Sequence, residues 1–179
     1  FYLSFVIFGM FIGRVSPAKY SFLPKFINKR NMTLGVVGAV FVVVAGLVLT
    51  TFYIRSFVAT LYFRSAVVAF NIDNDLPKTE SQLTSAAGIF SSDQYYRGLV
   101  DVYIRRMSDL ANGNAGDLSQ DQTLTAFQSA LSLAENAARN SIAIDTSNYI
   151  NWITLGRVYE SVVPFGVANA YDSAKAAYN

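Results

Sequence analysis

The feature that most limits how this chain can fold is an unbroken apolar stretch between Arg30 and Arg55. Residues 31–54 (NMTLGVVGAVFVVVAGLVLTTFYI) contain no charged residue. As a helix, this stretch would be ~36 Å long, slightly more than the ~30 Å hydrocarbon core of a bilayer. We therefore predict a transmembrane helix over 31–54. The alternative is a fully buried helix of a soluble protein, which requires a larger core than a chain of 179 residues usually builds.

Charge is divided unevenly along the chain. Residues 1–54 carry five basic and no acidic residues, whereas residues 55–179 carry nine basic and twelve acidic residues, so the net charges are +5 and −3. The overall charge of +2 therefore indicates no basic face for a nucleic acid. Short basic loops stay on the cytoplasmic side during membrane insertion, which predicts that residues 14–30 form a cytoplasmic loop. A site for nucleic acid or anionic lipid in this loop is the alternative, but topology alone explains its charge.

The apolar segments on either side of this loop and span complete the predicted membrane region. Residues 1–13 (FYLSFVIFGMFIG) are apolar throughout but reach only ~20 Å as a helix, so we predict the end of a truncated transmembrane helix. Residues 55–72 remain strongly apolar and are predicted to be a juxtamembrane helix. If the basic loop is cytoplasmic, one crossing places residues 73–179 on the extracytoplasmic side. The chain then reads as a fragment of a larger polytopic membrane protein.

The composition limits the chemistry that this chain can perform by itself. It contains neither cysteine nor histidine, which removes the usual metal ligands and the commonest general base. We therefore predict no catalytic residue, no metal site and no cofactor within the chain. Whether the full protein is an enzyme remains open, because an active site could lie upstream.

Residues 73–179 show amphipathic helical patterns with recognisable ends, and no alternating pattern that would indicate a strand. We predict an all-α domain of five helices, the last of them cut off. The first helix starts after Asn74 and Asp75 and runs to Phe90, and Ser91 to Asp93 start the second, which ends at the loop 112–117. The third starts with a capping box of Ser119 and Gln122, and the fourth with the caps Thr146 and Ser147. The fourth ends at Pro164 and Gly166, and the fifth starts at Ala168.

Two of these helices share a pattern of bulky and small residues. Tyr96-x-x-Leu99-Val100-x-x-Tyr103 matches Trp152-x-x-Leu155-Gly156-x-x-Tyr159, and the next helix carries Tyr171-x-x-Ala174-x-x-x-Tyr178. At these residues the chain resembles the tetratricopeptide repeat, in which a small residue lets the two helices of a hairpin touch and aromatic residues fill the space between hairpins. With the predicted span, the resemblance gives the predicted fold, transmembrane helices followed by a tetratricopeptide-like helical hairpin array. A generic array of helical hairpins is the alternative.

The same resemblance implies a binding face. Arrays of this family bind extended peptides or partner helices along a concave face, which the first helix of each hairpin lines. Arg97 and Arg157 could then receive a carboxylate through two parallel hydrogen bonds. Alternatively, the charged residues of the first helix, spaced four apart, pair with one another on a solvated face. The residues that the motif assigns to this face are Arg97, Asp101, Arg105, Ile153, Arg157 and Glu160.

The aromatic residues of these helices have two interpretations, packing within the array or a platform that stacks carbohydrate. Packing is the favoured one, because the aromatics follow helical spacing. The platform stays open because several tyrosines gather near the membrane. The residues concerned are Tyr95, Tyr96, Tyr103, Trp152 and Tyr159.

The overall layout, with closing spans, an apolar juxtamembrane helix containing Arg64 and the SSDQYYR stretch at 91–97, is similar to the C-terminal end of bacterial O-antigen ligase and polymerase-like proteins with tetratricopeptide tails. We predict an integral protein of the bacterial inner (plasma) membrane that acts as a scaffold, with a protein or peptide and the lipid bilayer as partners. The alternative is the end of a glycan ligase or polymerase with its active site upstream, whose partners would include cell-surface glycan assembly components. A cytosolic co-chaperone with reversed topology is a third possibility.

Overall fold

The computed structural model describes residues 29–114 and 116–179, with side chains described from residue 37 onward except at Ala39. The predicted truncated helix at 1–13 and nearly all of the predicted loop at 14–30 lie outside the described residues. Within the described residues every regular element is a helix, which confirms the predicted all-α class. The chain divides into two compact units, residues 1–49 and residues 50–179.

The first helix, α2, runs without a break from Lys29 to Val68, through both the predicted span and most of the predicted juxtamembrane helix. A π-helix, η1 (Ala69–Asp73), follows it directly. The segment Val40–Asp73 is long and apolar enough to cross a membrane, and its apolar 18-residue stretch has a mean hydropathy of 1.9 with no buried residue. From Val40 to Leu49 the large apolar side chains, such as Phe41, are largely exposed.

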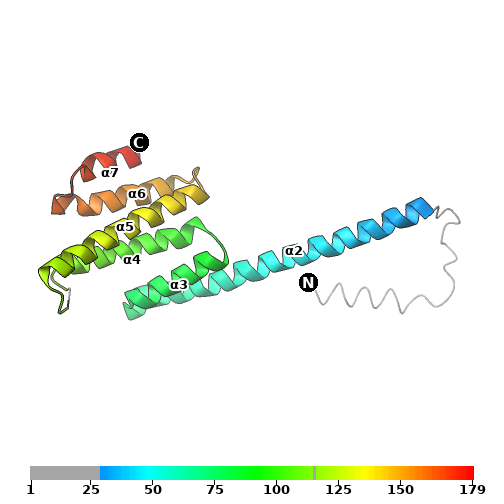
Figure 1. The fold of residues 1–179 in the computed structure, drawn as a ribbon, viewed down its shortest axis with the longest axis horizontal. Coiled ribbons are helices and arrows are strands. Elements are labelled where there is room, and N and C mark those ends of the chain that lie inside the picture. The colour runs from blue at the N-terminus through cyan, green and yellow to red at the C-terminus, as the bar shows by residue number, and fades with distance from the viewer. Residues whose placement is uncertain (1–28, 115) are drawn as a thin grey trace. The chain divides into compact units, whose positions relative to one another are not determined.

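The second unit contains the remainder of α2, η1, five further α-helices and a short 3-10 helix (Figure 1). α4 packs along α5 and α6 packs along α7, and each pair forms a helical hairpin. α3 also packs on α4, α5 on α6, and α4 on α6. The helices are α3 (Leu76–Ile89), α4 (Asp93–Ala111), α5 (Gln120–Ile144), α6 (Tyr149–Val162), the 3-10 helix η2 (Val163–Phe165) and α7 (Ala170–Tyr178).

The helix ends follow from local side-chain chemistry. The predicted capping box is present at α5, where Ser119 Oγ accepts from the Gln122 amide and the Gln122 side chain accepts from the Ser119 amide. The predicted cap of α6 is wrong: Asn148, not Thr146 or Ser147, is the N-cap, and its side chain accepts from the Ile150 amide. The reason is Asp145, whose Oδ1 accepts from two following backbone amides and so holds this turn outside the helix.

The core of the second unit is built mostly from small and branched side chains. α5 contributes several buried alanines to this core. The last turns of α2 contribute Ala66 to the same core. Near the chain end, Gly156 of α6 lies directly beneath the ring of Tyr178 of α7, as an added Cβ would stand 2.2 Å from its Cε1 atom. The buried α5 alanines are Ala130, Ala134, Ala137 and Ala138.

Candidate functional site

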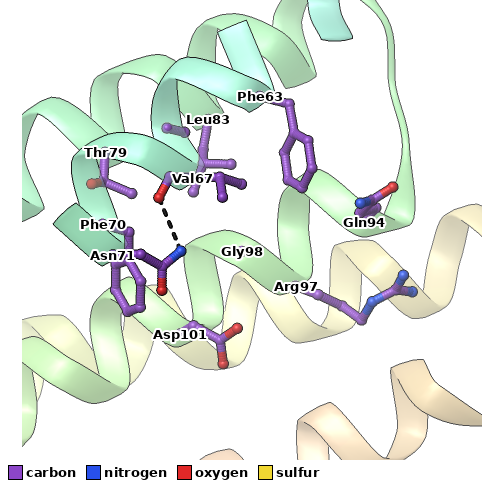
Figure 2. A pocket seen from close by; sticks show the side chains of 11 residues that line it. Phe63, Val67, Phe70, Asn71, Thr79, Leu83, Gln94, Arg97, Gly98 and Asp101 are labelled. Atoms are coloured by element: carbon purple, nitrogen blue, oxygen red, sulfur yellow. Dashed lines mark hydrogen bonds between the residues drawn. The ribbon is translucent and has the colours of Figure 1, made fainter.

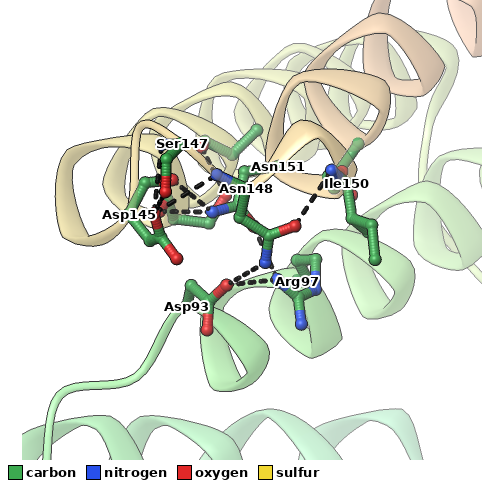
Figure 3. Close-up of polar contacts among 10 residues, drawn as sticks. Asp93, Arg97, Asp145, Ser147, Asn148, Ile150 and Asn151 are labelled. Atoms are coloured by element: carbon green, nitrogen blue, oxygen red, sulfur yellow. Dashed lines mark hydrogen bonds and ion pairs between the residues drawn. The ribbon is translucent and has the colours of Figure 1, made fainter.

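A polar cluster joins α4 to α6 at the N-terminal ends of both helices (Figure 3). Arg97 of α4 donates through Nη1 to Asp93 Oδ2 on its own helix and to Asn151 Oδ1 of α6, at 2.6 Å for the second contact. Asn148 also donates to Asp93 Oδ2, at 2.8 Å. These contacts link the first helices of two successive hairpins.

Asn151 is the centre of this cluster and is completely buried. Besides accepting from Arg97, its Nδ2 donates to the backbone oxygens of Ser141, at 3.0 Å, and of Asp145, at 2.8 Å. Because a buried amide is costly unless its hydrogen bonds are made, these partners fix the start of α6 against both α4 and the end of α5. Asn151 was not predicted from the sequence; a polar residue on the apolar side of an amphipathic helix is the signal that would have pointed to it.

The ionisation of Asp93 fits a structural role. Burial by itself would raise the pKa of this carboxyl, but the hydrogen bonds from Arg97 and Asn148 outweigh it and lower the pKa below its ordinary value. Asp93 is therefore ionised at neutral pH and does not act as a proton donor. The hydrogen bonds of the cluster hold the two helices together.

The other residues assigned to the binding face have varied surroundings. Asp101 of α4 and Arg157 of α6 meet in an ion pair of 3.1 Å, and both are about half exposed. Ile153 is exposed to 39 %. Arg105 pairs with Asp109 on its own helix. The structure thus brings Arg97, Asp101 and Arg157 to the contact between α4 and α6.

Glu160 of α6 and the charged residues of α4 do not have the partners that their spacing along each helix suggests. Glu160 accepts a hydrogen bond from the hydroxyl of Tyr178 at 2.7 Å and so contacts the second helix of its hairpin. Arg97, Asp101 and Arg105 do not pair with one another, although they are spaced four apart; each has a different partner. Arg97 also bonds to Asn151, and both this contact and the pair of Asp101 with Arg157 join residues more than fifty positions apart, which a local spacing rule does not reveal.

The tyrosines of the two motif helices make equivalent contacts. Tyr103 of α4 donates to Glu80 of α3 at 2.8 Å, and Tyr159 of α6 donates to Glu135 of α5 at 2.7 Å. Each glutamate also pairs with an arginine, which is Arg106 in the first case and Arg139 in the second. Burial and then the neighbouring glutamate raise the pKa of both tyrosines. The tyrosines at matching motif positions therefore serve the packing of successive helices.

The remaining aromatics in this region also favour packing over a carbohydrate platform. Tyr95 is buried, and its ring lies 5.3 Å from that of Phe63 of α2. Tyr96 is partly buried against the core. Trp152 is exposed to 41 %, but its indole Nε1 donates to the Thr146 carbonyl oxygen.

A cleft of about 400 Å³ lies beside the polar cluster, between the end of α2, η1, α3 and α4 (Figure 2). Its apolar part comes from Phe63, Val67 and Leu83. Arg97 and Asp101 contribute polar groups from α4, so two of the assigned binding residues line this cleft. A cleft of this size and lining can hold an apolar side chain of a partner, with polar groups at its margin.

Comparisons of the chain with protein-family models, with curated proteins and with solved structures found no match. The contacts between α2, α4 and α6 are therefore the basis on which a function can be argued.

Proposed function

We propose that this protein is a membrane-anchored helical-repeat scaffold that binds a protein or peptide partner along the face formed by α2, α4 and α6. The observation that carries the proposal is the direct link between α4 and α6 through Arg97 and Asn151, beside an open cleft that reaches α2. Such a face is the one that helical-repeat arrays offer to extended ligands. Binding would rest on complementary surfaces and needs no cofactor.

A tetratricopeptide-like arrangement is supported by three features of the second unit. Tyr103 and Tyr159 occupy matching motif positions and make the same contact with a glutamate of the preceding helix. Gly156 permits the close contact with Tyr178 that a small residue at this motif position is expected to allow. The end of α2 packs on α4 through Phe63 and Tyr95, as a preceding hairpin α2–α3 would.

The anchor is proposed from α2. Its large apolar side chains from Val40 to Leu49 are exposed, with values of 72 % at Phe41 and 63 % at Leu47. Placing such a surface in hydrocarbon rather than water is favourable by about 25 cal/mol for each Å² of apolar surface. The basic residues at 14–30 would keep that loop in the cytoplasm of a bacterial cell. The second unit would then lie on the extracytoplasmic side of the inner membrane.

The chemistry of the face suggests what kind of partner it takes. Arg97 is already bonded to Asp93 and Asn151, and Asp101 is paired with Arg157, so strong charge recognition would require breaking existing pairs. The cleft itself offers mainly apolar surface. We therefore expect an extended peptide or a helix that inserts an apolar side chain next to Val67 and Leu83.

The binding proposal is tested by site-specific photo-crosslinking in cells that express the full chain. A photoreactive residue at Asp101 should give a defined adduct with one protein, and filling the cleft with Val67→Trp should abolish it. Leu133→Trp, on an exposed position of α5 outside the cleft, is the matched control and should leave the adduct unchanged. An adduct that survives Val67→Trp, or no adduct at all, would contradict the proposed binding face.

The topology is tested separately, using the absence of cysteine from the chain. Ser119→Cys should react with a membrane-impermeant maleimide in intact cells, whereas Ser16→Cys in the basic loop should react only after permeabilisation. The reversed pattern would place the second unit in the cytoplasm and support the co-chaperone alternative.

A further inference from the structure

The turn between α3 and α4 is bound to α2 near the start of the second unit. The ring of Phe90, at the end of α3, lies 5.1 Å from that of Phe52 in an edge-to-face arrangement. Arg55 donates through Nε to the carbonyl oxygen of Ile89, at 2.9 Å. The turn is thus fixed to one helical turn of α2 by an aromatic contact and a hydrogen bond.

That part of α2 has the composition of a membrane–water boundary. Phe52, Tyr53 and Phe57 are each more than half exposed, although they are large aromatic side chains. Tyrosine rings and arginine side chains gather where hydrocarbon meets the polar headgroups. The charged residues between 29 and 72 are all basic, and the first acidic residue of the whole chain is Asp73. The charges here therefore match the phosphates of a bilayer surface.

The hydrogen bond from Arg55 also suits this location. The last carbonyl groups of a helix lack partners within the helix, and they become costly where water is scarce. Arg55 supplies a partner to Ile89 O, and within the described residues its two Nη groups have no protein partner. An arginine can keep such groups at headgroup level while its aliphatic part lies against apolar surface.

We propose that residues 89–92 and the Phe52–Phe57 turn of α2 together form a second contact with the membrane, in the headgroup layer, where the free Nη groups of Arg55 bind phospholipid phosphate. This inference rests on the proposed membrane anchor and adds to it. The residues of the second unit at this turn then lie in the headgroup layer. α4 begins at this turn and runs back along α3 for 19 residues, about 28 Å, so its far end lies in water.

Spin labels on single cysteines measure these depths in the full chain reconstituted into vesicles of phosphatidylcholine and phosphatidylglycerol. The labelled variants are Ser91→Cys in the exposed turn, Val44→Cys within the span and Asn114→Cys at the far end of α4. The ratio of oxygen to nickel-chelate accessibility reports depth. We expect the highest ratio at position 44, the lowest at 114, and a ratio at 91 several-fold above that at 114.

Two results overturn the proposal in distinguishable ways. If position 44 is in hydrocarbon but position 91 is as accessible to the nickel chelate as position 114, the second contact is wrong and the anchor stands. If position 44 is itself in water, the anchor and the second contact both fail.

The role of Arg55 is tested in the Ser91→Cys background. Arg55→Gln should move the label toward water, while Arg64→Gln, a second exposed arginine of α2, should not. An unchanged depth in Arg55→Gln, with helix content retained by circular dichroism, would refute binding of phosphate by Arg55.

Discussion

The hairpins α4–α5 and α6–α7 share a sequence motif but close in different ways. In the first, valine occupies position 100, and α5 contributes several buried alanines to the core. In the second, Gly156 occupies the matching position and receives the ring of Tyr178. The first interface is therefore distributed over many small contacts, whereas the second depends on one glycine and one aromatic ring. A shared motif thus does not imply equal sensitivity to a single substitution.

The largest effect is expected in the distributed core of the first hairpin. Met107 is 2 % exposed and lies in the main core cluster, so Met107→Ala should lower the free energy of unfolding by about 3 kcal/mol through lost contacts and a cavity. Leu124→Ala, at a position exposed to 57 %, should change it by less than about 0.5 kcal/mol. Urea unfolding of the detergent-solubilised chain, followed by circular dichroism, measures both. Equal effects would show that α4 does not form the core.

The next effect tests the single contact of the second hairpin. Gly156→Ala should lower the free energy of unfolding by about 2 kcal/mol, because the new methyl group would overlap the ring of Tyr178. Gly88→Ala is the matched control: it has open space around it, and alanine favours a helix by up to about 1 kcal/mol.

A double-mutant cycle identifies the cause of this loss. In a Tyr178→Ala background the ring is gone, so adding Gly156→Ala should cost little. An undiminished cost in that background would mean that the ring contact is not the reason, and that the two hairpins differ less than the structure indicates.

The link between the hairpins gives a smaller effect that depends on pH. Asp93→Asn should lower the free energy of unfolding by about 1.5 kcal/mol at neutral pH, since it weakens hydrogen bonds from Arg97 and Asn148 to a charged acceptor. Asp117→Asn, in the exposed loop, should stay within about 0.5 kcal/mol.

The sign of the pH effect follows from the lowered pKa of Asp93. A carboxyl that is more acidic in the folded state stabilises the fold above its unfolded pKa, and this contribution is lost as the pH falls through its lowered folded value. The free energy of unfolding should therefore fall less steeply with decreasing pH in Asp93→Asn than in the parent protein. An acid limb identical to that of the parent protein would contradict the role assigned to Asp93.

Several helix ends were predictable because capping chemistry is local, although the N-cap of α6 was misplaced. The capping box at Ser119 and the breaks at Pro164 and Gly166 are visible within a few residues, and the structure has both. The cluster around Asn151 was not predictable in this way. Its partner Arg97 lies 54 residues earlier, and helical periodicity contains no information on which helices become neighbours. Pairs four residues apart, such as Arg105 with Asp109, can be recognised, but they do not link helices.

The smallest expected effect is a change in the pKa of Tyr178, which tests the contact of this ring with Glu160 in the second hairpin. Burial, followed by its hydrogen bond to Glu160, raises the pKa of Tyr178 from 10.0 to about 12. Glu160→Gln removes the negative charge and should return the pKa toward 10, as measured by absorbance at alkaline pH after subtraction of the Tyr178→Phe spectrum. Because the folded pKa is raised, this contribution to stability is complete below pH 10 and disappears between pH 10 and about 12. If Glu160→Gln leaves the tyrosine titration unchanged, Glu160 does not hold the ring over Gly156, and packing alone closes the second hairpin.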